Sequence, residues 1–96
     1  MVLLTNSGVL PLAATPGRVV LVGDLAVTPR YQGDGSSRVV PTRVTAPLDA
    51  LTSRLGIESV TAVPGFPSTS GPDAPDADTL LQEALDAAGD ADVAIV

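Results

Sequence analysis

Three short apolar runs, separated by loops and helical patterns, constrain most strongly what this chain can fold into. They cover residues 18–23, 57–63 and 92–96, and the first of them reads RVVLVG. A continuous apolar run of this length is typical of a strand buried on both faces, as in a parallel sheet that helices cover. The run at 57–63 alternates less regularly, and we also interpret it as a strand.

A helix is predicted over residues 47–55 by its spacing and by its ends. Three leucines recur at helical spacing and form one apolar stripe: Leu48, Leu51 and Leu55. Pro47 suits the first turn after an N-cap at residue 45 or 46, and Gly56 suits the position that ends a helix.

A second helix is predicted over residues 78–88, with Asp78 as its N-cap and Gly89 at its end. Its expected apolar stripe is Leu81, Ala84, Leu85 and Ala88. The resulting order of strand, helix, strand, helix and strand predicts an α/β fold. We expect a partial three-layer α/β sandwich with a mainly parallel sheet and right-handed crossovers.

This order leaves the predicted sheet incomplete. Three strands and two helices make a sparse sheet, and no covering element follows the last run. We therefore expect the chain to be part of a larger domain or to complete its sheet with a partner. Two long segments lack regular patterns. Residues 25–46 are long enough to be a candidate for function, and residues 64–78 are expected to form a mobile loop.

Composition excludes several classes of function. Five Arg, no Lys and eleven Asp plus Glu give a net charge of −6. A phosphate-binding surface needs clustered cations, so we expect no nucleic-acid partner. No apolar run approaches the roughly 20 residues of a membrane span, so we expect no membrane contact. Because Cys and His are absent, disulfides, Cys/His zinc sites, a histidine base and a cysteine nucleophile are excluded.

The carboxylates do not follow a metal-binding pattern. Many of them lie within residues 73–92, where their spacing lacks the alternating ligands and terminal glutamate of a calcium loop. We expect a solvated face and helix caps there, with no bound metal and no cofactor. The aspartates concerned are Asp73, Asp76, Asp78, Asp86, Asp90 and Asp92.

A glycine-rich loop and an aspartate after the first strand are the features best suited to binding. Asp24 follows that strand, and open α/β sheets bind ligands outside the carboxyl ends of their strands. The loop YQGDGSSR spans residues 31–38, and its small residues let a backbone approach a ligand closely. The residues alone leave a structural interpretation open for each: a turn residue and an exposed loop. Three arginines bracket the loop and either bind a carboxylate or sugar hydroxyls or form salt bridges that hold the loop: Arg30, Arg38 and Arg43.

Several segments, taken in order, resemble the start of the C-terminal α/β sandwich domain of family 3 glycoside hydrolases, the β-glucosidase family. They are VLLTN and LPL within residues 2–12, the run RVVLVG, the loop PRYQGDGSSRV at 29–39, PTRV at 41–44 and PLDAL at 47–51. The resemblance covers nearly all of the chain and is weakest over residues 64–78. It implies that residues 1–96 are the first part of that sandwich domain and that 93–95 form a central or near-central strand, whose open edge in this chain favours association. The opening motif and the loop are specific when they occur together at this spacing.

This resemblance implies a two-domain retaining enzyme that hydrolyses β-glycosides through a covalent glycosyl-enzyme intermediate. In such an enzyme an (α/β)8 barrel supplies the nucleophilic aspartate, and a later part of the sandwich domain supplies the general acid/base. The implied partners are the β-glycoside substrate, the barrel and the remainder of the sandwich domain. The chain alone would lack both catalytic carboxylates and be inactive. The residues expected near the bound sugar are Gly33, Asp34, Gly35, Ser36 and Ser37.

Two residues depart from the family pattern. Asp34 stands where the family has a glycine, and its carboxylate either hydrogen-bonds a sugar hydroxyl or faces water. Thr5 replaces a lysine, which leaves the contact between domains at that position open. A second class of function also stays open, a small non-catalytic α/β binding module that uses Asp24 and the loop. Cytoplasmic and secreted locations are both compatible with the chain, because a targeting segment would lie upstream.

Overall fold

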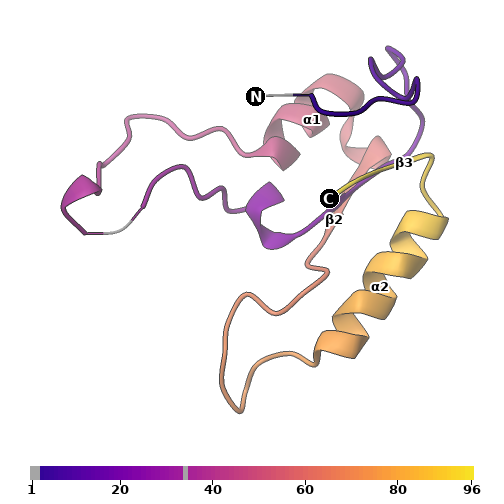
Figure 1. Ribbon diagram of the computed structural model, residues 1–96. Coiled ribbons are helices and arrows are strands. Elements are labelled where there is room, and N and C mark those ends of the chain that lie inside the picture. Colours follow the sequence, from indigo (N-terminus) through magenta and orange to yellow (C-terminus); the bar gives the residue numbers. More distant parts are fainter. Residues whose placement is uncertain (1–2, 34) are drawn as a thin grey trace.

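The chain forms a three-stranded parallel sheet between two helices. A computed structural model describes residues 3–33 and 35–96. The sheet has the strand order β2-β1-β3, so β1 is the central strand (Figure 1). The elements, in chain order, are β1 (Val19–Val22), α1 (Pro47–Leu55), β2 (Val60–Val63), α2 (Ala77–Gly89) and β3 (Val93–Ile95). The predicted α/β fold with a parallel sheet is confirmed.

The strand β1 holds the fold together because it has a neighbour on each side and a helix over each face. Val19 pairs in register with Val60 of β2 and with Val93 of β3. Successive side chains of a strand point to opposite faces, so β1 contributes to two apolar layers. Its three buried residues, Val19, Val20 and Leu21, are each at most 2% exposed. The continuous apolar run in the sequence thus reflects burial on both faces.

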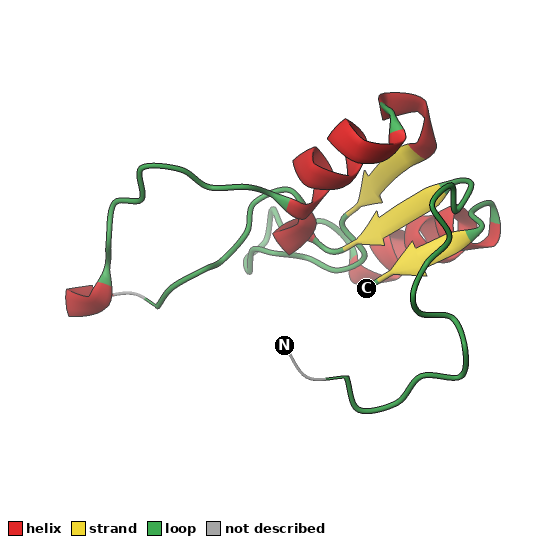
Figure 2. Ribbon diagram, turned by 90° about the horizontal axis from the view of Figure 1, so that it is seen from above, coloured by secondary structure: helices red, strands yellow, loops and turns green. Residues whose placement is uncertain are grey.

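The two helices lie on opposite sides of the sheet and complete three layers (Figure 2). On one face, Val19, Leu21 and Val60 form a buried cluster against the leucines of α1: Leu48, Leu51 and Leu55. This confirms the predicted stripe of α1. The predicted bounds of α1 are also confirmed: Ala46 is the N-cap, and the helix ends at Leu55 with Gly56, which has a φ of +95°, as the C-cap.

The helix α2 differs from its predicted form in its cap and in the side it buries. It begins at Ala77 and is capped by Asp76, so Asp78 is not the N-cap. Leu80 and Ala84 are buried, whereas Leu81 and Leu85 are 52% and 56% exposed. The predicted stripe was therefore wrong apart from its alanines. Small alanine side chains let the helix approach the sheet closely, which turns the two larger leucines outward.

One strand prediction also needs correction. Residues 57–59 form a 3-10 turn, so β2 starts only at Val60. Among the described residues β3 pairs with β1 alone, which leaves its other side as an open edge of this sheet. A central or near-central place for β3 in the larger domain stays a prediction. Asp92 positions the start of β3: its side chain accepts a hydrogen bond from the backbone N–H of Arg18 (2.8 Å), and its own N–H donates to the Arg18 carbonyl (2.9 Å).

The longer connections carry no regular structure beyond single turns. Residues 64–76 link β2 to α2, and this segment ends two residues earlier than predicted because α2 begins at Ala77. In the described part of the connection from β1 to α1, the regular structure is limited to two 3-10 turns, Asp24–Ala26 and Gly35–Ser37. No helix in the described parts of the chain has the length and apolar character needed to cross a membrane.

Candidate functional site

The connection between β1 and α1 projects from the carboxyl end of the sheet as a long arm, residues 28–44. Figure 1 shows it leaving the body of the fold after β1 and returning at the start of α1. Residues just outside the two ends of the arm, Ala26 and Pro47, line one apolar cavity of about 340 Å³ together with Val22 and Ile95. The arm is therefore anchored where open α/β sheets bind their ligands.

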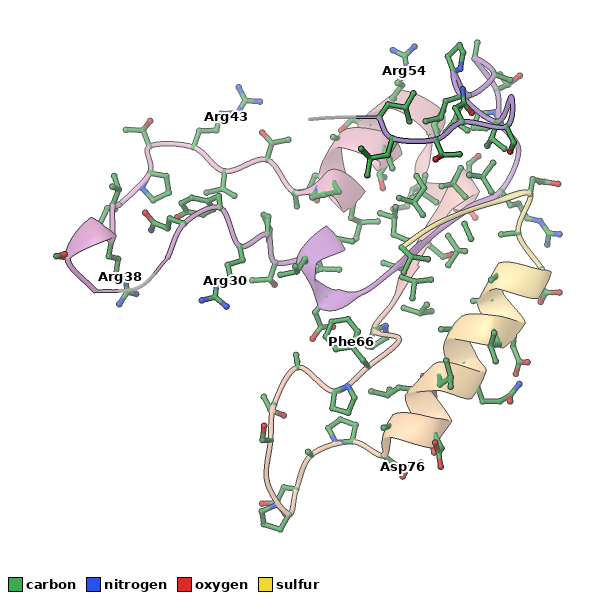
Figure 3. All side chains as sticks on the ribbon, in the orientation of Figure 1. Arg30, Arg38, Arg43, Arg54, Phe66 and Asp76 are labelled. Carbon is green, nitrogen blue, oxygen red and sulfur yellow. The ribbon has the colours of Figure 1, made fainter. Side chains whose placement is uncertain are left out.

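The floor of this cavity is apolar and packs the base of the arm. Phe66, from the connection after β2, lies against the end of β1 (Figure 3), and a Cβ at Gly23 would lie 3.6 Å from its ring. Gly23 has a φ of +117°, a conformation that favours glycine. The remaining lining residues are Leu21, Leu25 and Val96. This lining offers packing surface and few polar groups, so we assign it a structural role.

One glutamine side chain holds the two limbs of the arm together. The Gln32 amide donates from Nε2 to the carbonyl of Val39 (2.8 Å), and its Oε1 accepts from the Val39 backbone N–H (2.7 Å). These bonds close residues 33–38 into a short tip. Within the tip, the N–H of Arg38 donates to the carbonyl of Gly35 (3.1 Å), which has a φ of +81°.

The structure places the described members of the predicted sugar-binding set at this tip, far from the sheet (Figure 1). Gly33, Gly35 and Ser36 are exposed there, and Ser37 completes the 3-10 turn with Gly35 and Ser36. Asp34 lies outside the described residues. The tip thus offers a serine hydroxyl and glycine backbone to whatever faces it.

Asp24 is not brought to the tip. It begins the 3-10 turn at the base of the arm, where its carbonyl accepts hydrogen bonds from the backbone N–H groups of Val27 (3.1 Å) and Thr28 (2.8 Å). This arrangement supports the interpretation of Asp24 as a turn residue. Of the two features predicted to bind a ligand, only the glycine-rich loop at the tip is therefore kept as a candidate.

The arginines of the arm are exposed and lie on two sides of it. Arg30 and Arg38 extend to the same side in Figure 3, whereas Arg43 extends to the opposite side. A cavity of about 570 Å³ lies between the limbs, and both Arg30 and Arg38 line it. The other lining residues are Thr28, Pro29, Tyr31, Gln32, Gly33, Val39, Val40 and Pro41.

Two carboxylates at α2, those of Asp76 and Asp86, have structural roles. Asp76 caps α2 by accepting from the backbone N–H and from the hydroxyl of Thr79, both at 2.8 Å. These bonds, the backbone one first, hold the pKa of Asp76 below its ordinary value of 3.8 against a small opposing effect of desolvation. Asp86 accepts a hydrogen bond from Gln82 (2.8 Å). Among the described residues, no group of three or more acidic side chains is placed to hold a metal ion.

Gln32 is the residue of the candidate site that sequence reasoning missed. A side-chain amide can donate and accept at the same time, so it can replace both bonds of a strand pair. Its partner lies seven residues away, a separation that matches no helical or turn pattern. The sequence offers one indication of this role, a glutamine directly before the glycine-rich part of a long connection.

The chain matches the model of one protein family along its whole length. The match covers residues 1–96 and is to the glycosyl hydrolase family 3 C-terminal domain. No solved structure shows a significant match to the chain.

Among curated proteins, two similar relatives are named exo-alpha-(1->6)-L-arabinopyranosidase. The chain is 43% identical to the one from Bifidobacterium longum and 42% identical to the one from Bifidobacterium breve (strain ACS-071-V-Sch8b), each over 84 residues. These matches cover 88% of the chain and 10% of each relative.

A third relative, named thermostable beta-glucosidase B, comes from Acetivibrio thermocellus and is 38% identical over 97 residues, which is 100% of the chain and 12% of that protein. The chain thus spans about a tenth of the length of the curated relatives it matches. By its match to the family model over all of its residues, the chain belongs to glycosyl hydrolase family 3, where it corresponds to part of the C-terminal domain.

Proposed function

We propose that this chain works as part of a longer family 3 glycoside hydrolase, in which the arm forms one lip of the sugar-binding cleft. The residues nearest the sugar in this proposal are Gly33, Asp34, Gly35, Ser36 and Ser37. The observation that carries it is the closed and exposed tip, which the Gln32–Val39 pair holds away from the body of the fold. A binding loop on a stable scaffold is a common arrangement in enzymes.

The reactive carboxylates, in this proposal, lie in other parts of the enzyme. Retaining glycosidases need two carboxyl groups about 5–5.5 Å apart, one as nucleophile and one as acid/base. Asp76, Asp86 and Asp92 of this chain accept structural hydrogen bonds instead. An (α/β)8 barrel would supply the nucleophilic aspartate, and a later part of the sandwich domain the acid/base. These are the partners of the chain, and without them it would be inactive.

The names of the relatives support a substrate with an equatorial anomeric bond. One relative is named as a beta-glucosidase and two as alpha-L-arabinopyranosidases. An α-L-arabinopyranoside has the ring configuration of a β-D-galactopyranoside without the C6 hydroxymethyl group, so its anomeric bond is also equatorial. We therefore propose that the enzyme removes β-D-glucosyl or α-L-arabinopyranosyl units.

The proposal is tested with the full-length protein that contains this chain. Its hydrolysis of aryl β-D-glucosides and aryl α-L-arabinopyranosides is measured beside that of a Ser36→Ala variant. Ser70→Ala serves as the control, because Ser70 is an exposed serine in the connection before α2. We expect Ser36→Ala to lower kcat/KM by about five- to tenfold through loss of a hydrogen bond, with an unchanged melting temperature.

Two outcomes count against this function. Equal losses of activity and stability in Ser36→Ala would make Ser36 a structural residue. A full-length protein that binds these sugars but hydrolyses none of them would favour the non-catalytic binding module instead.

A further inference from the structure

We propose that the arm selects glycosides that carry a carboxylate on the leaving-group sugar, through a site formed by Arg30 and Arg38. This inference rests on the proposed function, because it names the substrate class of the same cleft. Three observations support this site: the distribution of charge along the chain, the placement of the two arginines and the composition of the cavity between the limbs.

The arm is cationic on an otherwise acidic fold. It holds three arginines and one aspartate, so its net charge is +2. The remaining residues hold two arginines and ten carboxylates, so their net charge is −8. An anionic ligand would be repelled by the body and attracted to the arm, with a range of about 8–10 Å at physiological salt.

The Gln32–Val39 pair brings two of these cations to one cavity. Arg30 lies two residues before Gln32 on the outgoing limb, and Arg38 directly precedes Val39 on the returning limb. Their guanidinium groups extend to the same side of the arm, and Arg43 extends to the other (Figure 3). Both Arg30 and Arg38 line the cavity of about 570 Å³ between the limbs.

The composition of this cavity suits a carboxylate on a sugar. None of its described lining residues is acidic. A guanidinium group can bind a carboxylate through two parallel hydrogen bonds, which lysine cannot do. Tyr31, which is 54% exposed, adds a flat apolar surface with a hydroxyl at its edge, and a sugar ring fits such a surface. Its volume of about 570 Å³ falls within the range of small-molecule sites.

The experiment compares two substrates that differ only in charge. One is a disaccharide whose leaving-group sugar is a uronic acid, and the other is the same disaccharide as its uronamide. The ratio of their kcat/KM values is measured for the full-length protein and for Arg30→Gln, Arg38→Gln and Arg43→Gln. Arg43→Gln is the matched control, because it removes the same charge from the same arm on the other side.

We expect the wild-type ratio to favour the uronic acid by about five- to twentyfold at low salt. Arg30→Gln and Arg38→Gln should each lower this ratio by about three- to tenfold. Arg43→Gln should lower it by less than twofold. A wild-type ratio near one, or an equal effect of Arg43→Gln, would overturn the proposal.

Two further measurements separate this inference from the proposed function and from a plain anion site. If the protein hydrolyses neither substrate, the proposed function fails, and calorimetry with glucuronate and glucuronamide tests the arginine site directly. Tighter binding of glucuronate that is lost in Arg38→Gln would support the site, and equal binding would overturn it. Inorganic phosphate is titrated in parallel. Binding of phosphate with no preference for glucuronate would show a site for inorganic anions and overturn the assignment to sugars.

Discussion

The side-chain amide of Gln32 makes both of its hydrogen bonds to the backbone of a single residue, Val39. The distances are 2.8 Å from Nε2 to the Val39 carbonyl oxygen and 2.7 Å from the Val39 nitrogen to Oε1. This pairing imitates the exchange of bonds between two strand residues, although neither limb of the arm is a strand. It converts a long connection into a short closed tip.

Replacement of Gln32 should open the arm. Two hydrogen bonds at about 0.5–1.5 kcal/mol each hold the limbs together, so Gln32→Ala should increase the open population by about fivefold or more. Limited trypsin cleavage after the exposed Arg38 measures this population, because a protease needs an extended backbone. Gln32→Glu should behave similarly, since a carboxylate accepts from the Val39 N–H but repels its carbonyl.

Gln82→Ala is the control for this substitution. It removes a glutamine whose amide bonds only to Asp86 on the surface of α2. Cleavage rates that rise equally in both variants would mean that the Gln32 pair does not hold the arm.

The side of α2 that faces the sheet is tested by two adjacent leucines. Leu80 is 9% exposed and Leu81 is 52% exposed. Leu80→Ala should lower the free energy of unfolding by roughly 2–4 kcal/mol, as for other buried leucines, and Leu81→Ala by less than about 1 kcal/mol. Chemical denaturation of the full-length protein, followed through the transition of this domain, measures both. A larger loss of stability in Leu81→Ala than in Leu80→Ala would instead support the apolar stripe that the sequence predicts.

This contrast between Leu80 and Leu81 illustrates how far the sequence determines the fold. The residues at 19–22 could be placed from sequence because burial on both faces leaves a continuous apolar run, and Pro47 and Gly56 bracket α1 by backbone preferences alone. The orientation of α2 could not be predicted, because two overlapping stripes of Ala and Leu are equally periodic. Close packing against the sheet selects the stripe with the smaller residues.

The sequence indicates which residues belong to the candidate site, but not how they are arranged in space. The glycines and serines at 33–37 were singled out through the resemblance to a family alone, and their place beside a sugar stays a prediction. The Gln32–Val39 pair and the shared side of Arg30 and Arg38 depend on how the limbs fold back on each other. Such contacts within an irregular connection leave no periodic signal.

A close approach at Gly65 should make this residue intolerant of substitution. Gly65 has a φ of +77°, and an added Cβ would lie 2.5 Å from the Val22 side chain. Gly65→Ala should therefore combine backbone strain with steric overlap and cost about 2–4 kcal/mol of unfolding free energy. Gly8→Ala is the matched control, because Gly8 has a φ of +97° with nothing within 4 Å of the new Cβ. It should cost only the backbone strain, about 1–2 kcal/mol. Equal denaturation midpoints for the two variants would contradict the close approach.

Acid should weaken the start of α2 through Asp76. Hydrogen bonds from Thr79 lower the pKa of Asp76 in the folded state, so its stabilising effect is present above the ordinary value of 3.8. The effect is lost as the pH falls through the lowered pKa. Asn caps helices without titrating, so the stability of the wild type relative to Asp76→Asn should fall on acidification below about pH 4.

The unfolding midpoints of both proteins, measured against pH, check this expectation. Thr79→Val removes the hydroxyl donor and keeps the backbone donor, so it should reduce the pH dependence without abolishing it. A wild type and an Asp76→Asn variant with parallel pH profiles would show that Asp76 is not a charged cap.

Hydrogen exchange of the arm in the full-length protein tests most directly whether the tip lies at the sugar site. Exchange at short labelling times is compared with and without a saturating thioglycoside, which binds like a substrate and is not hydrolysed. We expect slower exchange at residues 33–38 and unchanged exchange in the connection at 64–76. Protection elsewhere in the protein with no change at 33–38 would contradict the assignment of the arm to the cleft.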